Sequence, residues 1–151
     1  MYPRWATAYG NLATVYSQLG QFDKAVAATN QGRAIEPDRV IWEEGLVNLL
    51  LAQNRYGDTW RIATEALAKD PEDPTFHLAL YALAFLANDE AGMAAQEQSL
   101  ASKPDYEHFG LWLAADTEAY HGQLKKARES TQRAVSSAVR GRVLPCHRPM
   151  K

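Results

Sequence analysis

Four residues that tolerate a left-handed backbone recur every 34 positions along the chain: Gly20, Asn54, Asn88 and Gly122. Each of them lies between two stretches in which apolar residues repeat at helical spacing. Helices commonly end at such a residue, because the left-handed conformation lets the chain turn back and bond the last carbonyl groups of the helix. The interval therefore predicts four copies of one unit, in which a tight turn joins two helices.

The first unit, residues 9–37, indicates how its two helices would pack. Leu12, Ala13 and Tyr16 fall on one face of the first helix, which we expect to be the inward face. The second helix carries a stripe of small residues: Ala25, Ala28, Thr29 and Gly32. Small residues opposite bulky ones let two antiparallel helices approach closely. Pro37 ends the unit, because proline cannot continue a helix.

The same unit carries a recognisable motif. It follows the pattern W-x2-L-G-x2-Y…A-x3-F…P at Tyr9, Leu12, Tyr16, Ala25 and Pro37, with tyrosine in place of the tryptophan. Ala13 stands for the glycine, Thr29 stands for the aromatic residue, and Gly32 occupies a position where alanine is usual. The unit therefore resembles the tetratricopeptide repeat, a family with a period of about 34 residues.

The resemblance implies an all-α fold, an α-α superhelix of about four helix-turn-helix repeats in a right-handed stack. The repeats are expected at about residues 6–38, 39–73, 74–106 and 107–140. Within the last repeat, helical spacing places Val135 toward the core. After Arg140 the sequence has two prolines and no periodicity, so residues 141–151 are predicted to form a disordered basic tail. No polar capping element is visible at either end, which indicates a fragment of a longer array.

Two later stretches extend the resemblance. HLALYALAFLANDEAGMAAQ (77–96) and ADTEAYHGQLKKARESTQRAVSSA (115–138) are similar to the C-terminal tetratricopeptide repeat region of bacterial serine/threonine protein kinases, of the kind abundant in acidobacteria. Similar arrays follow winged-helix transcriptional regulators. The kinase motifs themselves, a glycine-rich loop, His-Arg-Asp and Asp-Phe-Gly, are absent from the sequence. The resemblance implies an accessory binding array of a larger signalling protein, without an activity of its own.

Charge is unevenly distributed along the chain. Residues 1–120 carry 8 basic and 17 acidic residues, a net charge of −9, whereas residues 121–151 carry 8 basic residues and one acidic residue, a net charge of +7. The basic end could contact nucleic acid, anionic lipid or an acidic partner. Alternatively, it is a solvated last helix that the helix dipole stabilises. No aromatic residue lies among the basic ones, which argues against nucleic acid.

The sequence gives little reason to expect a membrane protein. No apolar run is long enough to span a bilayer, and no signal peptide is visible at the start. We therefore expect no membrane insertion, and the chain as given favours a cytoplasmic location. The single cysteine, Cys146, says little about the compartment.

Three pairs of residues resemble parts of chemical sites: Glu118 with His121, Cys146 with His147, and Glu43 with Glu44. The first has the Glu-x-x-His spacing of metal sites in helical bundles, which need two such motifs. The second supplies two of the four ligands that a structural zinc requires. The third consists of adjacent carboxylates, which point apart on a helix. We therefore expect no catalytic residue, metal or cofactor, and no enzyme activity.

In the family that the chain resembles, the first helix of each pair lines the concave surface. The corresponding residues form the predicted partner-binding groove: Asn11, Thr14, Gln18, Glu44, Asn48, Leu51, Leu78, Phe85, Phe109, Trp112, Asp116 and Tyr120. The first half of this set is small and polar, and the second half is aromatic. The positions of the carboxylate clamp of chaperone-binding repeats hold Gly10, Thr14, Gly45, Thr75 and Ala79, which include no cation. An acidic tail is therefore not the expected ligand.

Two classes of function follow from these features. The first is a protein-interaction module that binds a peptide or partner protein in the groove, where the aromatic residues would hold an apolar segment. The second is a structural segment that packs against its own neighbouring domain or another copy, and a weak homodimer through the uncapped ends is expected. Alternatively, the four aromatic residues of the groove are part of the core and pack between the third and fourth repeats: Phe85, Phe109, Trp112 and Tyr120.

Overall fold

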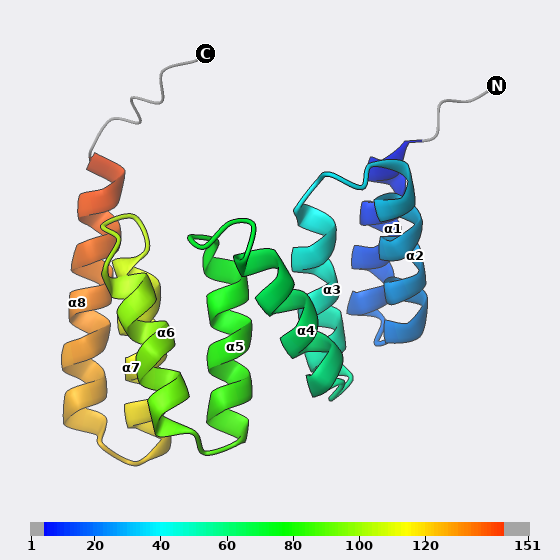
Figure 1. The fold of residues 1–151 in the computed structure, drawn as a ribbon. Helices are drawn as coiled ribbons and strands as arrows, with labels where there is room; N and C mark the ends of the chain where they lie inside the picture. Colours follow the sequence, from blue (N-terminus) through cyan, green and yellow to red (C-terminus); the bar gives the residue numbers. More distant parts are fainter. Residues whose placement is uncertain (1–4, 144–151) are drawn as a thin grey trace. The chain divides into compact units, whose positions relative to one another are not determined.

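The computed structural model describes residues 5–143 of the 151, with the side chains of residues 5–140. In this part of the chain the regular elements are eight α-helices (Figure 1): α1 (Ala6–Gln18), α2 (Phe22–Ile35), α3 (Ile41–Ala52), α4 (Tyr56–Leu67), α5 (Pro74–Leu86), α6 (Glu90–Ala101), α7 (Glu107–Tyr120) and α8 (Leu124–Val143). The chain divides into two units, Met1–Leu83 and Ala84–Lys151, and the boundary falls inside α5. The predicted all-α class with helix-turn-helix pairs is confirmed.

The four turn residues adopt the predicted backbone conformation. Gly20, Asn54, Asn88 and Gly122 have φ angles of 70°, 59°, 56° and 75°, and they are the residues with positive φ in the described chain. At each turn the following residue donates its N–H to the carbonyl five positions back, at 2.8–2.9 Å. The turn residue itself donates to the carbonyl three positions back, at 3.0–3.1 Å. This pair of bonds defines the Schellman motif, so all four turns close in the same way.

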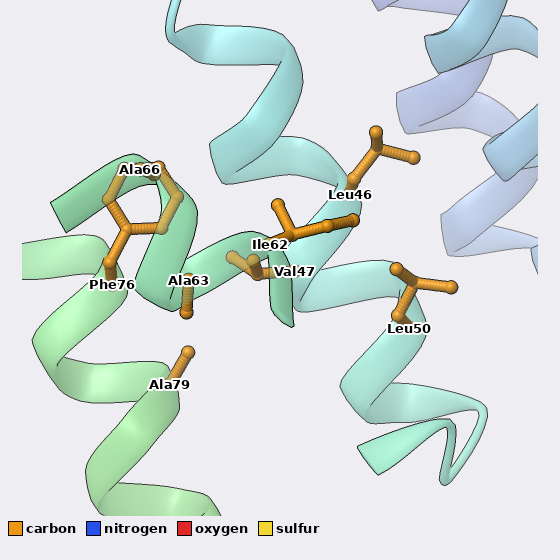
Figure 2. Close-up of a cluster of buried hydrophobic side chains, with 8 residues drawn as sticks. All are labelled: Leu46, Val47, Leu50, Ile62, Ala63, Ala66, Phe76 and Ala79. Atoms are coloured by element: carbon orange, nitrogen blue, oxygen red, sulfur yellow. The ribbon is translucent and has the colours of Figure 1, made fainter. Parts of the chain in front are cut away.

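The core of the first unit joins its last three helices. Leu46, Val47 and Leu50 of α3 meet the following residues of α4 and α5 (Figure 2): Ile62, Ala63, Ala66, Phe76 and Ala79. Ala63 of α4 and Ala79 of α5 point toward one another within this cluster. Val47, Ala63 and Phe76 are completely buried. At about 1.5–3 kcal/mol for each large apolar side chain removed from water, this cluster supplies much of the stability of the unit.

Small residues bring the helices of the second unit together. α7 packs against both α6 and α8. Gly110 is buried, and a Cβ at that position would lie 3.1 Å from the backbone oxygen of Glu97 on α6. On α8 the buried positions are Ala127, Ser130, Ala134 and Ser137. The close approach therefore depends on glycine, alanine and serine rather than on large side chains.

Two residues predicted to face the core point outward, and that prediction was wrong. Leu12 of α1 is 39% exposed, and Val135 of α8 is 59% exposed. On α1 the buried positions are Ala6 and Ala13, so Ala13 of the predicted face is buried, and Leu12 lies beside the buried face. On α8 the buried face is narrow because it follows Ala127, Ser130, Ala134 and Ser137, and Val135 lies beside that face.

The C-terminal helix is longer than expected. α8 continues to Val143, three residues into the stretch predicted as a basic tail. The remainder of that stretch, residues 144–151 with Cys146 and His147, lies outside the described residues.

A matched pair of glycine substitutions tests the turn. Gly20→Ala should lower the free energy of unfolding by about 1–2 kcal/mol, because a Cβ strains the left-handed conformation, although no atom lies within 4 Å of the place it would occupy. Gly57→Ala in α4, which is equally open but has no positive φ, should be neutral or raise it by up to about 1 kcal/mol. Denaturant unfolding of both variants measures the difference, and equal effects would contradict the proposed cause.

Candidate partner-binding surface

A groove of about 460 Å³ lies between α1 and α3 in the first unit. One wall is α1, which contributes a row of uncharged polar side chains: Thr7, Asn11, Thr14, Ser17 and Gln18. The other wall is α3, with Ile41, Trp42, Gly45, Asn48 and Leu49, while Thr29 and Arg39 complete the lining. Arg39 is the one charged residue of this lining.

Trp42 is the largest side chain of the groove, and it is almost completely buried, with 4% of its surface exposed. Its six-membered ring fills the place where residue 32 would carry a Cβ, so a side chain at that position would overlap the ring. Gly10 approaches the same ring, at 3.6 Å from its own Cβ position. The Trp42 side chain therefore requires Gly32, at a position where the tetratricopeptide pattern usually has alanine. The Trp42 indole nitrogen has no hydrogen-bond partner among the described residues.

Four of the predicted groove residues come together here. Asn11, Thr14 and Gln18 face Asn48 across the groove between α1 and α3. The Thr14 hydroxyl donates to the Gly10 carbonyl oxygen at 3.1 Å, so the side-chain amides of the other three are the more versatile groups. Each amide offers both donors and an acceptor. That these residues bind a partner stays a prediction.

Glu44 and Leu51 do not line this groove. The residues of α3 that do so are Ile41, Trp42, Gly45, Asn48 and Leu49, and Glu44 instead lies against Asp73, which precedes α5. Leu51 is half-buried. That Glu44 and Leu51 contact a partner stays a prediction.

Sequence reasoning missed Arg39, Ile41 and Trp42 as lining residues. Arg39 lies in the connection before α3, where a helical pattern gives no information. Its guanidinium pairs with the Glu36 carboxylate at 2.9 Å. Both side chains are largely exposed, so this ion pair adds little stability.

Glu44 and Asp73 form a carboxyl pair in the first unit. Asp73 is buried, and its Oδ1 accepts the backbone N–H of Thr75 at 2.8 Å, which caps the start of α5. Burial, followed by the charge of Asp73 and a hydrogen bond with it, raises the pKa of Glu44 above its ordinary value of 4.5. The surroundings of Glu44 therefore favour the protonated form of its carboxyl group.

The remaining predicted residues lie in two places. Leu78 is half-buried on α5 in the first unit. In the second unit Phe109, Trp112, Asp116 and Tyr120 follow one face of α7 at helical spacing.

The aromatic residues of the second unit are partly accessible. The ring of Tyr120 meets that of Phe85 edge to face, with centroids 5.1 Å apart, and Tyr120 is 74% exposed. Trp112 is 50% exposed, and Phe109 lies against His108 with ring centroids 4.1 Å apart. Tyr120 and Trp112 are therefore available at the surface of this unit, while Phe85 and Phe109 are half-buried.

Of the two pairs considered as metal sites, only Glu118 with His121 lies in the described part of the chain. Among residues 5–143 no group of three or more histidine, cysteine, aspartate and glutamate side chains is arranged to hold a metal ion. Within the same range, no helix is both long enough and apolar enough to cross a membrane.

The contact between Gly32 and Trp42 yields a stability prediction. Gly32→Ala should lower the free energy of unfolding by about 1–3 kcal/mol, because the new methyl group overlaps the indole ring and forces it to move. Gly45→Ala is the matched control, since its Cβ would meet the Thr29 side chain at an ordinary 3.5 Å. Thermal unfolding compares the two variants. If Gly45→Ala is the more harmful one, the steric account of Gly32 fails.

The carboxyl pair yields a pH prediction. A raised pKa means that the folded chain binds the Glu44 proton more tightly than the unfolded chain does, so stability falls as the pH rises above about 4.5. Glu44→Gln removes this loss, so the variant should unfold at a higher temperature than the parent at pH 7.5 and at the same temperature near pH 4. Glu43→Gln removes the adjacent carboxylate and serves as the control. A gain of Glu44→Gln that is equal at both pH values would contradict the assignment.

Comparison with known proteins supports the repeat assignment. A family model described as "Tetratricopeptide repeat" matches residues 6–38, which hold α1, α2 and the turn at Gly20. A relative with such repeats is the mouse (Mus musculus) "Interferon-induced protein with tetratricopeptide repeats 2", which is 27% identical over 147 residues. The similarity covers 87% of this chain and 31% of that protein, so the chain spans about a third of the length of its relative.

Repeats of this class generally mediate protein–protein interactions and are generally non-catalytic. The helix pairs and the four equivalent turns make the described chain an all-α helical repeat, whose architecture is consistent with the tetratricopeptide repeat that residues 6–38 match.

Proposed function

We propose that this chain is a non-catalytic protein-interaction module that binds an extended, uncharged segment of a partner protein in the groove between α1 and α3. The observation that supports this proposal is the composition of the groove. Its polar residues are amides and hydroxyls, its base is the buried Trp42, and its one cation, Arg39, already pairs with Glu36.

The chemistry of the walls suits a peptide backbone. An extended segment presents one N–H and one C=O for each residue along its length. The amides of Asn11, Gln18 and Asn48 can bond either group, so they can accommodate a backbone whatever its side chains are. Ile41 and Leu49 offer apolar surface to a ligand side chain. Because the groove has no unpaired charge, it favours neither acidic nor basic ligands.

A second contact surface is proposed on α7, in the other unit. Trp112 and Tyr120 would hold an apolar segment of the same partner or of another one, because aromatic rings supply contact area at a low cost in side-chain entropy. Asp116 on the same face would pair with a lysine or arginine of that segment and fix its direction. Half-buried Phe109 and Phe85 would support this surface from beneath.

The wider context is also a proposal. The similarity of residues 77–96 and 115–138 to repeats that follow bacterial kinases suggests an accessory region of a larger cytoplasmic signalling protein, in which this chain recruits a partner. The coverage of a third of a longer relative is compatible with a part of a longer array. Nucleic acid is the less favoured ligand, since no aromatic side chain lies among the basic residues of α8.

Selection from a library tests the groove. Random dodecapeptides displayed on phage should yield ligands poor in charged residues, and their affinities should change little between low and high salt. Asn48→Ala and Asn11→Ala should each weaken these peptides about tenfold, the value of a hydrogen bond of about 1.5 kcal/mol. Gln31→Ala, an exposed amide on α2 outside the groove, should leave binding unchanged.

Two results would contradict the proposal. Selected peptides rich in aspartate and glutamate, with affinities that fall steeply with salt, would show that charge directs binding. Equal effects of Asn48→Ala and Gln31→Ala, measured by fluorescence anisotropy with labelled peptides, would place the site elsewhere.

A further inference from the structure

Two glycines of the groove are not required by the fold. Gly10 lies inside α1 and Gly45 lies inside α3, and both line the groove. A glycine inside a helix lowers stability relative to alanine, because it loses more backbone freedom on folding. Other described glycines have a structural reason, which is either a positive φ angle or an atom close to the place of a Cβ: Gly20, Gly32, Gly92, Gly110 and Gly122.

Neither reason applies to Gly10 or Gly45. Neither of them is among the described glycines with a positive φ angle. A Cβ on Gly10 would lie 3.6 Å from the Trp42 ring, and a Cβ on Gly45 would lie 3.5 Å from the Thr29 methyl carbon, which are ordinary contact distances. Alanine would therefore fit at each position, and the helix would favour it. What the two glycines provide is open space in the groove.

The surface that borders this space is apolar. The Trp42 atoms nearest to the Cβ position of Gly10 are ring carbons. The Thr29 hydroxyl donates to the Ala25 carbonyl oxygen at 2.9 Å, and the Thr29 methyl carbon is the atom nearest to the Cβ position of Gly45. A polar ligand group placed here would lose its hydrogen bonds to water without replacement, whereas an apolar side chain would gain from leaving water.

The groove face of α1 does not depend on what precedes this helix. Ile41 and Asn48 of α3 stand one repeat length after Thr7 and Thr14 of α1. Both are exposed, although the helix pair α1–α2 precedes α3. A further helix pair packed before α1 in the same way would therefore leave the groove face of α1 open.

We propose that the space at Gly10 and Gly45 is a subsite for one large apolar side chain of the partner segment, such as leucine, methionine or phenylalanine. This proposal rests on the proposed peptide binding in the same groove. Side chains of an extended segment alternate between its two sides. A segment whose backbone is bonded by the amides of Asn11 and Asn48 therefore directs every second side chain toward the base of the groove. A methyl group added at either glycine would take the space of the ligand side chain.

Fluorescence anisotropy with phage-selected dodecapeptides tests the subsite. Peptides selected against the parent should share one large apolar residue. Gly10→Ala and Gly45→Ala should each weaken these peptides about tenfold, because the added methyl group overpacks the subsite. Both variants should melt about 1–4 °C above the parent, so that weaker binding is not a sign of unfolding.

Two controls separate the subsite from the rest of the groove. Synthetic copies of the selected peptides with alanine at the shared position should bind the parent about tenfold more weakly, and they should lose little further affinity for Gly10→Ala or Gly45→Ala. Gly57→Ala removes a glycine from α4, outside the groove, and should leave the binding of all peptides unchanged.

Several results would overturn this proposal. Selected peptides without a shared apolar position, or glycine variants that bind them as tightly as the parent does, would show that no ligand side chain uses this space. If both variants weaken the alanine-containing copies as much as the original peptides, the glycines act through the helices and not through the ligand side chain. In all these cases a loss of affinity in Asn48→Ala would leave the groove itself in place. A parent that selects no peptide would contradict the groove, and the subsite with it.

Discussion

The helix pairs of the described chain depend on one backbone constraint, a left-handed residue after the first helix. The residue that follows it bonds a carbonyl five positions back, so the first helix ends and the second one begins at a fixed place. At Gly20 and Gly122 no neighbouring atom would obstruct a side chain, so the requirement is conformational and not one of packing. Asn54 and Asn88 adopt the same conformation with a polar side chain. Because the four turns are alike and recur at an equal interval, each of them fixes where one described helix ends and the next begins.

This constraint explains which parts of the fold the sequence could predict. A turn depends on the residue at the turn itself, so Gly20 and its three equivalents could be identified without knowledge of any neighbour. The inward face of a helix depends on what covers it, and Leu12 and Val135 were assigned wrongly because they are apolar residues on faces that no described helix of their own unit covers. Gly32 was recognised as unusual, but the reason for a glycine there is the ring of Trp42, which belongs to a different helix pair.

The candidate site, like the fold, could be predicted from the sequence only in part. Helical spacing was enough to place Asn11, Thr14 and Gln18 together, since they lie on one face of a single helix. The environment of Glu44 depends on its contact with Asp73, which is distant in sequence. Helical periodicity does not predict such a contact. Arg39 lies outside any helix and was missed for that reason. Groove residues could thus be predicted where they all lie on one helix. They could not be predicted where the environment of a residue depends on a second element.

The position of Trp42 has a consequence for how the protein opens. Its ring belongs to the second helix pair but occupies space that the first pair leaves empty at Gly32 and Gly10. Separation of α1 and α2 from the remainder of the first unit would expose a large indole to water, at a cost of about 1.5–3 kcal/mol for a side chain of this kind. In a linear array of repeats, such a term couples nearest neighbours. We therefore expect the helix pairs α1–α2 and α3–α4 to exchange their amide hydrogens as a single cooperative segment.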